Sequence, residues 1–387
     1  MTENTKILES VLTSMQERRQ NVSTGNQKNQ EIDSIHIRYS GDRLNLGDIL
    51  DSAIDYGTSD IHFSGGEKIA FRINGDIRFA ENVPKLTNEQ AEQLIFTFIQ
   101  NEREKEMLLR TRELDIAYEH VDGTLFRVNI FFKCGNIATV CRLISREAFS
   151  MDGLGLPPAI EDVLKLRHGL ILVTGPTGSG KSTSVQSIVE HINDNRVEHI
   201  LTIEDPVEFV FESRKSIISQ REVGKDTLSY ANALKASLRE DPDVIVIGEM
   251  RDAETIAIAL NLAETGHLVI STLHTSSASK TVNRIINLFP SNQQKKVQER
   301  VADLLACVLS QRLLPRQDQE GRIALFELMI ANNAIRNLVR NGDFVQLDNA
   351  IQSGRNEGMI TMESHAAFLL ERGIISEKDV ARILNHG

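Results

Sequence analysis

The spacing of apolar residues changes along the chain and divides it into regions of different expected structure. Up to about residue 45 the sequence is polar, apart from apolar residues at helical spacing between Ile7 and Met15. The stretch NVSTGNQKNQE at 21–31 is typical of a flexible linker. We therefore expect residues 1–45 to form a polar leader, either disordered or carrying a short helix that docks on a partner.

Residues 46–145 mix helical periodicity with short alternating strands. LGDILDSAIDYG at 46–57 has the helical pattern and stops at Gly57, and Thr87–Leu109 is a second helical stretch. The segments IHFS, IAFRI, IRFA, IAYEH, LFRVNIFF and IATVCRLI have the alternation of strands, with NGD and VDG as turns. This pattern predicts an α+β domain.

After the Gly- and Pro-containing linker at 146–158, which we expect to act as a hinge, the pattern changes. Four short apolar runs at 170–174, 200–203, 244–248 and 268–272 alternate with helical segments. Such alternation predicts an α/β core with a mostly parallel sheet covered on both faces, here assigned to residues 159–330. From Ser291 the sequence is largely helical, with one strand at Ile323–Glu327, and residues 331–387 are expected to form a helical C-terminal region.

Composition narrows the classes of protein. The 43 Lys and Arg residues against 54 Asp and Glu residues give a net charge of −11, which argues against a basic surface for nucleic acid. The three cysteines form no CxxC pair, which disfavours a disulfide scaffold or a four-cysteine zinc site. No apolar run approaches the ~18 residues of a membrane span. We expect a soluble protein of a reducing compartment.

The segment GPTGSGKST fits the GxxxxGK[ST] phosphate-loop pattern, and it follows an apolar strand and opens a helix. Glycines let backbone N–H groups turn inward around an anion, and the helix N-terminus adds a positive dipole end. Lys181 supplies a charge for the β- and γ-phosphates, and the Ser182 hydroxyl is an oxygen ligand for Mg²⁺. The residues expected to bind ATP are Gly175, Pro176, Thr177, Gly178, Ser179, Gly180, Lys181, Ser182 and Thr183.

Acidic residues follow two of the predicted parallel strands. Glu249 ends DVIVIGE, and Glu204 ends the strand in ILTIEDPVEF. The carboxyl ends of parallel strands share one edge of the sheet, so both residues should lie on the edge of the phosphate loop. Either one is a candidate for activating the attacking water, and Glu249 is also a candidate for contacting Mg²⁺ through a water molecule. The sequence leaves open which of them is the base.

Two histidines, His267 and His274, bracket the strand in TGHLVISTLH. His274 follows the strand and should therefore lie on the phosphate edge. Of the two, His274 is the better candidate for a nucleotide contact.

Together these segments resemble the secretion and type IV pilus motor ATPase family. GPTGSGKST looks like its phosphate loop, TIEDPVEF its aspartate box, DPDVIVIGEMRD its atypical Walker B segment and TGHLVISTLH its histidine box. The resemblance covers roughly residues 46–387. SQREV at 219–223 and AIRNLVR at 334–340 resemble the twitching-motility retraction branch of the family, whereas the paired-cysteine insert of the assembly ATPases is not visible.

The resemblance implies a homohexamer with a PAS-like N-terminal domain, a RecA-like P-loop NTPase core and a helical C-terminal region. It implies ATP and Mg²⁺ as cofactors, and a cytoplasmic motor that acts on an inner-membrane platform protein and, indirectly, on pilin. It also implies that Arg127 in FRVN and Arg142 in CRLI are arginine fingers. AIRNLVR would serve retraction rather than hydrolysis.

Three alternatives stay open at this point. The chain could be an assembly, secretion or conjugation ATPase of the same superfamily. It could be a nucleic-acid translocase, which its acidic charge disfavours. It could also be a regulatory ring partner that binds nucleotide but hydrolyses little, which the presence of Lys181, Glu204 and Glu249 disfavours.

Overall fold

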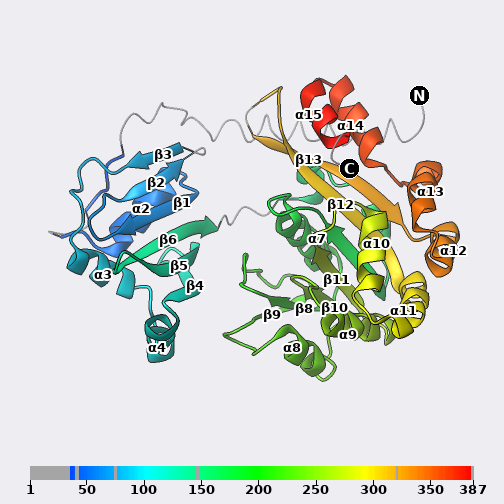
Figure 1. The fold of residues 1–387 in the computed structure, drawn as a ribbon, viewed down its shortest axis with the longest axis horizontal. Coiled ribbons are helices and arrows are strands. Elements are labelled where there is room, and N and C mark those ends of the chain that lie inside the picture. Colours follow the sequence, from blue (N-terminus) through cyan, green and yellow to red (C-terminus); the bar gives the residue numbers. More distant parts are fainter. Residues whose placement is uncertain (1–34, 40–42, 74–75, 145–148, 320, 385–387) are drawn as a thin grey trace. The chain divides into compact units, whose positions relative to one another are not determined.

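The computed structural model describes residues 35–39, 43–73, 76–144, 149–319 and 321–384 (Figure 1). Most of the predicted leader, residues 1–34, lies outside the described residues. The chain divides into two compact units, one within residues 26–147 and the other within residues 148–205 and 211–387. No helix in the described part of the chain has the length and apolar composition needed to cross a bilayer.

The N-terminal unit is a six-stranded antiparallel sheet with three helices, in the strand order β3-β2-β1-β6-β5-β4. Apolar residues of α2 and α3, such as Ile49, Leu50 and Ile95, share one core with Phe71 and Phe126 of the sheet. The elements are α2 (Leu46–Asp55), β1 (Asp60–Ser64), β2 (Ala70–Ile73), β3 (Asp76–Phe79), α3 (Asn88–Phe96), α4 (Glu102–Thr111), β4 (Glu113–Glu119), β5 (Leu125–Lys133) and β6 (Asn136–Ile144).

Two details of this unit differ from the sequence pattern. Ile35 and Ile37 lie within the predicted leader, yet both are buried in this core, and Ile35 forms a β-bridge with Ala80. The single helix predicted over Thr87–Leu109 is two helices, because Asn101 has extended backbone and its side chain accepts a hydrogen bond from the Glu104 N–H. Asn101 therefore starts α4 as an N-cap rather than continuing α3.

The larger unit is a seven-stranded sheet in the order β13-β12-β7-β11-β10-β8-β9, parallel except for the edge strand β13. Its strands are β7 (Gly169–Thr174), β8 (His199–Glu204), β9 (Ile217–Glu222), β10 (Val244–Ile247), β11 (Leu268–Leu273), β12 (Leu305–Pro315) and β13 (Arg322–Ile330). Its main helices are α7 (Lys181–Asn195), α8 (Tyr230–Ser237), α9 (Ala253–Glu264), α10 (Ala278–Asn287) and α11 (Ser291–Leu304).

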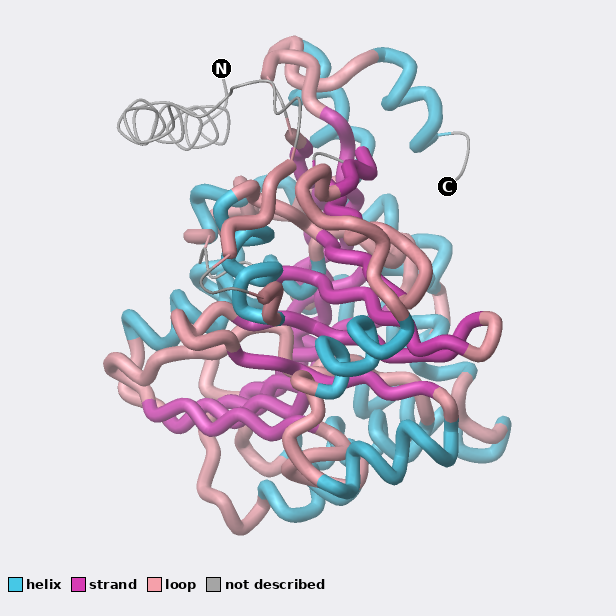
Figure 2. Tube along the Cα trace, turned by 90° about the vertical axis from the view of Figure 1, so that its left-hand side faces the viewer, coloured by secondary structure: helices cyan, strands magenta, loops and turns pink. Residues whose placement is uncertain are grey.

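Both faces of this sheet are buried, which confirms the predicted α/β core. Alternate residues of β7 enter different apolar clusters: Leu170 and Leu172 pack with α9 and α10, and Ile171 and Val173 pack with α7. Figure 2 draws the helices and the strands along the chain in separate colours. The four apolar runs identified in the sequence are β7, β8, β10 and β11.

Strand β12 was wrongly predicted as helix. It follows α11 directly, and it is buried between β7 and β13, so it lacks the apolar–polar alternation of a half-exposed strand. Strand β9 was also missed. The strand predicted at Ile323–Glu327 is present as part of β13.

The second part of the predicted linker is folded onto the core. α5 (Met151–Leu154) contributes Met151, and the next turn contributes Leu156, to the apolar cluster that contains Ile188 of α7. A short helix, α6 (Ile160–Val163), follows. The region after β13 is helical, as predicted, with α12 (Asn333–Asn341), α13 (Leu347–Ser353), α14 (Met362–Glu371) and α15 (Glu377–Leu384).

Candidate functional site at the carboxyl edge of the core sheet

The phosphate loop joins β7 to α7, as the motif requires. Gly175 has φ 153°, and a Cβ atom there would lie 2.3 Å from the Gln311 carbonyl oxygen. Gly180 caps α7 in the left-handed region, with φ 86°. At these two positions only glycine gives the loop its path without strain.

Gln311 of β12 holds the loop from the neighbouring strand. Its Nε2 donates a hydrogen bond to the Ser179 carbonyl at 2.7 Å, and both side chains are buried. The sequence did not point to Gln311, because β12 was predicted as helix. Had residues 305–315 been predicted as a strand next to β7, Gln311 would have been a candidate for a contact with the phosphate loop.

Lys181 is drawn into the phosphate loop. Its Nζ donates to the carbonyl oxygens of Gly175 at 2.9 Å and Pro176 at 3.1 Å, and it lies 3.4 Å from Nδ1 of His274. The side chain is only 8% exposed. The ammonium group therefore lies inside the loop that is expected to bind phosphate.

His274 links Lys181 to Glu249. Its Nε2 lies 3.0 Å from Glu249 Oε2, and Arg251 pairs with the same carboxylate. Burial, together with the charges of Lys181 and Arg251, lowers the pKa of His274. A neutral His274 can accept from Lys181 at Nδ1 and donate to Glu249 at Nε2, so the structure brings three predicted site residues into one network.

Glu204 lies on the same edge and is held by different partners. Its Oε1 accepts from Thr202 Oγ1 at 2.6 Å and from Gln220 Nε2 at 3.1 Å. Gln220 belongs to the SQREV segment, so this segment has a contact at the site. Since β8 is three strands from β7, its end lies ~14 Å from the phosphate loop across the sheet, against ~10 Å for β10.

The residues present suit a magnesium ion. Ser182 lies in the first turn of α7 and is exposed, and the carboxylate of Glu249 lies on the same edge of the sheet. Hydroxyl, carboxylate and phosphate oxygens are the ligands that Mg²⁺ prefers.

The two predicted arginine fingers lie side by side in the N-terminal unit. Arg127 on β5 pairs in register with Arg142 on β6. Arg142 Nε contacts Asp60 Oδ1 at 2.8 Å, and Arg72 Nε lies 3.9 Å from the other carboxylate oxygen. Three arginines thus occupy one row across β2, β6 and β5, with Asp60 on β1 among them. Their action on phosphate remains a prediction.

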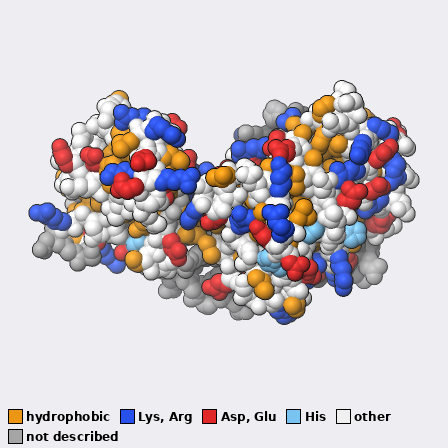
Figure 3. Space-filling model, turned by 90° about the horizontal axis from the view of Figure 1, so that it is seen from below, with side chains coloured by type: hydrophobic (Ala, Val, Ile, Leu, Met, Phe, Trp, Pro, Cys, Tyr) orange, Lys and Arg blue, Asp and Glu red, His pale blue; other side chains and the backbone are white. Residues whose placement is uncertain are grey.

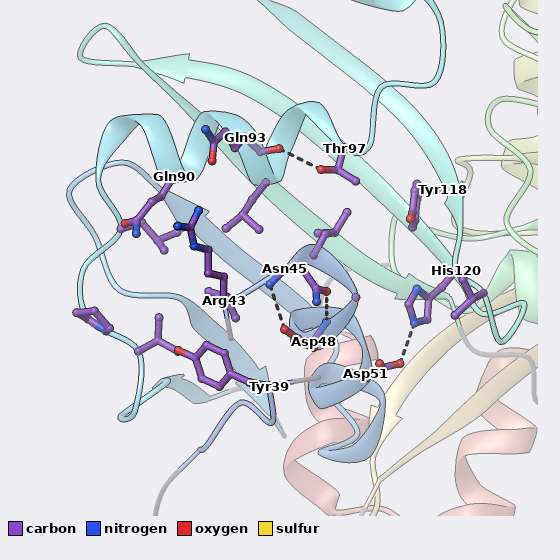
Figure 4. A pocket seen from close by; sticks show the side chains of 18 residues that line it. Tyr39, Arg43, Asn45, Asp48, Asp51, Gln90, Gln93, Thr97, Tyr118 and His120 are labelled. Carbon is purple, nitrogen blue, oxygen red and sulfur yellow. Dashed lines mark hydrogen bonds and ion pairs between the residues drawn. The ribbon is translucent and has the colours of Figure 1, made fainter. Parts of the chain in front are cut away.

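A cavity of about 820 Å³ opens in the N-terminal unit (Figure 4). The buried side chain of His120 lies at its wall, 2.8 Å from Asp51, and the capping pair Asn45 and Asp48 lies beside it. Among the described residues, none of the predicted site residues lines this cavity. This cavity is therefore separate from the candidate catalytic residues of both units.

The AIRNLVR segment forms most of α12 and is anchored to the end of α11. Ile335 and Val339 are buried, as its helical pattern predicts. Arg336 donates to the carbonyl of Ala302 at 2.8 Å and also to that of Asp303, and Arg340 pairs with the Asp303 carboxylate at 2.6 Å. Since α11 leads directly into β12, this segment holds the junction before the strand that supports the phosphate loop.

Comparison with known proteins identifies the family of the chain. The family described as "Type II/IV secretion system protein" matches residues 43–382. The chain is 42% identical over 331 residues to a "Twitching motility protein" of Neisseria gonorrhoeae, covering 84% of this chain and 88% of the relative. It is 41% identical over 336 residues to the "Type IV pilus retractation ATPase PilT" of Pseudomonas aeruginosa, covering 87% and 97%.

A solved structure of the pilus retraction motor PilT with bound ADP is similar in fold. Its TM-score is 0.83 at 42% identity, and the match covers 88% of this chain and 97% of that one. This similarity and the family match confirm the predicted fold class, with a RecA-like ATPase core.

Proposed function

Because the chain belongs to the type II/IV secretion system protein family, we propose that it is a hexameric ATPase motor that drives retraction of type IV pili. The chain is an ATPase of this family and binds nucleotide. The observation that carries the proposal is the network of Lys181, His274 and Glu249 beside the phosphate loop, in a chain that is 41% identical to a relative named as a retraction ATPase.

ATP would be bound through backbone N–H groups of the phosphate loop and through Lys181. The α7 N-terminus and the Lys181 ammonium stabilise the charge that develops on the transferring phosphoryl group. Ser182 would hold Mg²⁺, with Glu249 reaching it through a water molecule, and the ion would neutralise phosphate charge. Arg127 and Arg142 would act as fingers in the assembled ring.

Glu204 and Glu249 are assigned different roles in hydrolysis. Glu249 lies among Lys181, His274 and Arg251, at the cationic phosphate end of the edge, which suits the metal side of the site. Glu204 is fixed in orientation by Thr202 and Gln220, which suits a base that must point at one water molecule. We assign Glu204 as the base and Glu249 as the group on the magnesium side.

The conformational change that follows hydrolysis would be transmitted from the phosphate loop through β12. The strand contacts the phosphate loop through Gln311, and α12 holds the α11–β12 junction through Arg336. A motor of this kind would work on an inner-membrane platform protein from the cytoplasmic side, and pilin would return to the membrane as subunits.

The first test replaces the phosphate-loop lysine. Lys181→Ala should lower ATP turnover by ~10³-fold, because the charge that meets the transition state is lost. Lys280→Ala is the matched control, since Lys280 is an exposed lysine in the first turn of another helix, α10. Wild-type turnover in Lys181→Ala would rule out the ATPase site.

A second test separates retraction from the alternatives. Deletion of the gene should leave abundant surface pili that do not retract. Bald cells would indicate an assembly ATPase, and unchanged pili would indicate a secretion or conjugation role. On the face drawn in Figure 3, basic and acidic side chains are interspersed on both units, and DNA-stimulated turnover would be needed to support a nucleic-acid motor.

A further inference from the structure

A buried carboxylate, Glu327, lies in the middle of β13 and takes no part in the chemistry described so far. Its side chain is 7% exposed. Burial, with smaller contributions from the nearby Asp348 and Glu363, raises the pKa of Glu327 to about 7, although hydrogen bonds from Ala278 and Ser310 lower it. A carboxyl group in such surroundings costs free energy unless its partners hold it.

The partners of Glu327 connect two parts of the candidate active site. Oε1 accepts a 2.7 Å hydrogen bond from the N–H of Ala278, the first residue of α10. Ala278 lies four residues after His274. The residues between them join the end of β11 to the start of α10. The carboxylate is thus a second cap for α10, beside the Ser277 hydroxyl that accepts from Lys280.

The other partner leads to the phosphate loop. Thr174, Ser310 and Glu327 lie in register on the neighbouring strands β7, β12 and β13. Thr174 Oγ1 donates to Ser310 Oγ at 2.9 Å, and Ser310 hydrogen-bonds to the Glu327 side chain. Thr174 and Ser310 are fully buried, and Thr174 is the residue before Gly175. One row of buried polar groups therefore runs from the base of the phosphate loop to the start of α10.

We propose that Glu327 is a positioning residue for ATP hydrolysis, which keeps the His274 turn in register with the phosphate loop. It touches no reacting atom. It acts by fixing the distance between two segments whose side chains, Lys181 and His274, meet at 3.4 Å. This inference rests on the proposed ATPase function.

The position of its oxygen, rather than its charge, should be the property of Glu327 that matters. Glu327→Gln keeps an oxygen that can accept from the Ala278 N–H, with the amide NH₂ facing Ser310. Glu327→Asp keeps the charge but withdraws the acceptor by one methylene. Both changes are small enough for the buried site, which avoids the cavity that alanine would leave.

The experiment compares kcat and KM for ATP in the full-length variants. Glu327→Asp should lower kcat by ~10-fold or more, because a shift of about 1 Å at a catalytic group is costly, and KM should change less than ~3-fold. Glu327→Gln should stay within ~3-fold of wild type. In a His274→Gln background, Glu327→Asp should have little further effect, because the two changes act on the same contact.

The matched control is His365→Phe on α14. His365 is also buried and accepts a 2.9 Å hydrogen bond from the backbone of Phe326, the neighbour of Glu327, but it is not in the polar row. His365→Phe should leave kcat within ~2-fold of wild type. This control separates a general loss of packing around β13 from a displacement of the Glu327 carboxylate.

Several outcomes would overturn the inference. They are wild-type kcat in Glu327→Asp, an inactive Glu327→Gln beside an active Glu327→Asp, a loss of kcat in His365→Phe as large as that in Glu327→Asp, and full additivity with His274→Gln. An inactive wild type would instead count against the proposed function itself. The two failures are therefore distinguishable in one set of assays.

Discussion

Two carboxylates lie on the same edge of the core sheet, yet their surroundings differ. Glu249, after β10, contacts His274 and Arg251 and is linked through His274 to Lys181. Glu204, at the end of β8, accepts hydrogen bonds from Thr202 and Gln220. Two acids in equivalent sequence contexts can therefore have separate roles, because neighbouring side chains set which charge each one meets.

The largest expected effect comes from Glu204→Gln. If Glu204 is the base, turnover should fall by ~10²- to 10⁴-fold, the range for a lost general base. The Mg²⁺ concentration for half-maximal activity should stay unchanged. The measurement is steady-state turnover across a magnesium titration.

The control for this change is Glu254→Gln on α9. Glu254 is an exposed carboxylate paired with Lys235 at 2.7 Å, and exposed pairs of this kind contribute little. If Glu204→Gln keeps more than a tenth of wild-type turnover, the assignment of the base to Glu204 fails.

The second effect concerns the magnesium side. Glu249→Gln should raise the Mg²⁺ requirement by ~10- to 100-fold, the cost of losing a group that orients metal-bound water. Much of the turnover should return at high Mg²⁺. An unchanged Mg²⁺ requirement with a large fall in turnover would reverse the two assignments.

Glu204 and Glu249 show which parts of the site could be predicted from the sequence. GxxxxGK[ST] and the apolar runs predicted the phosphate loop and the edge on which Glu204, Glu249 and His274 lie. The order of β7, β11, β10 and β8 could not be read from the pattern, because it depends on how each crossover packs. Without that order, neither the distance of each acid from the loop nor its partners follow.

The residues that the sequence missed lie on β12 and β13. Gln311 and Glu327 stand in strands buried on both faces, where polar side chains interrupt an apolar run without any motif to identify them. Their contacts with Ser179 and Ala278 join segments that are far apart in the chain. Only the folded sheet brings them to the site.

A smaller effect should come from His274, which lies between Lys181 and Glu249. Since the pKa of His274 is lowered, it stays neutral below the ordinary histidine range, and wild-type turnover should hold down to below pH 6.5. Protonation would add a positive charge facing Lys181 and remove the acceptor at Nδ1. His274→Gln should lower turnover by ~10-fold at neutral pH. It should also remove the acid limb of the pH profile, which is the fall in turnover that protonation of His274 causes at low pH.

The pH profile of Glu204→Gln sharpens this result. Glu204→Gln, measured at its low residual rate, should keep the acid limb, because its changed side chain is not in the Lys181–His274 contact. An identical limb in His274→Gln would show that another group causes it, and the link between His274 and Glu249 would then have no role in turnover.

The smallest effect on hydrolysis is expected far from both strand ends, at Arg340 on α12. Its ion pair with Asp303 is partly exposed, and such pairs contribute about 0–1 kcal/mol, so Arg340→Ala should change turnover by less than ~3-fold. Retraction of pili should nevertheless be lost, because the α12 segment holds the α11–β12 junction through which motion would pass. The measurements are ATP turnover of the purified protein and twitching of cells that carry the same variant. If turnover falls as far as retraction, α12 is a structural support for the phosphate loop, and the separation of chemistry at the strand ends from motion at α12 is wrong.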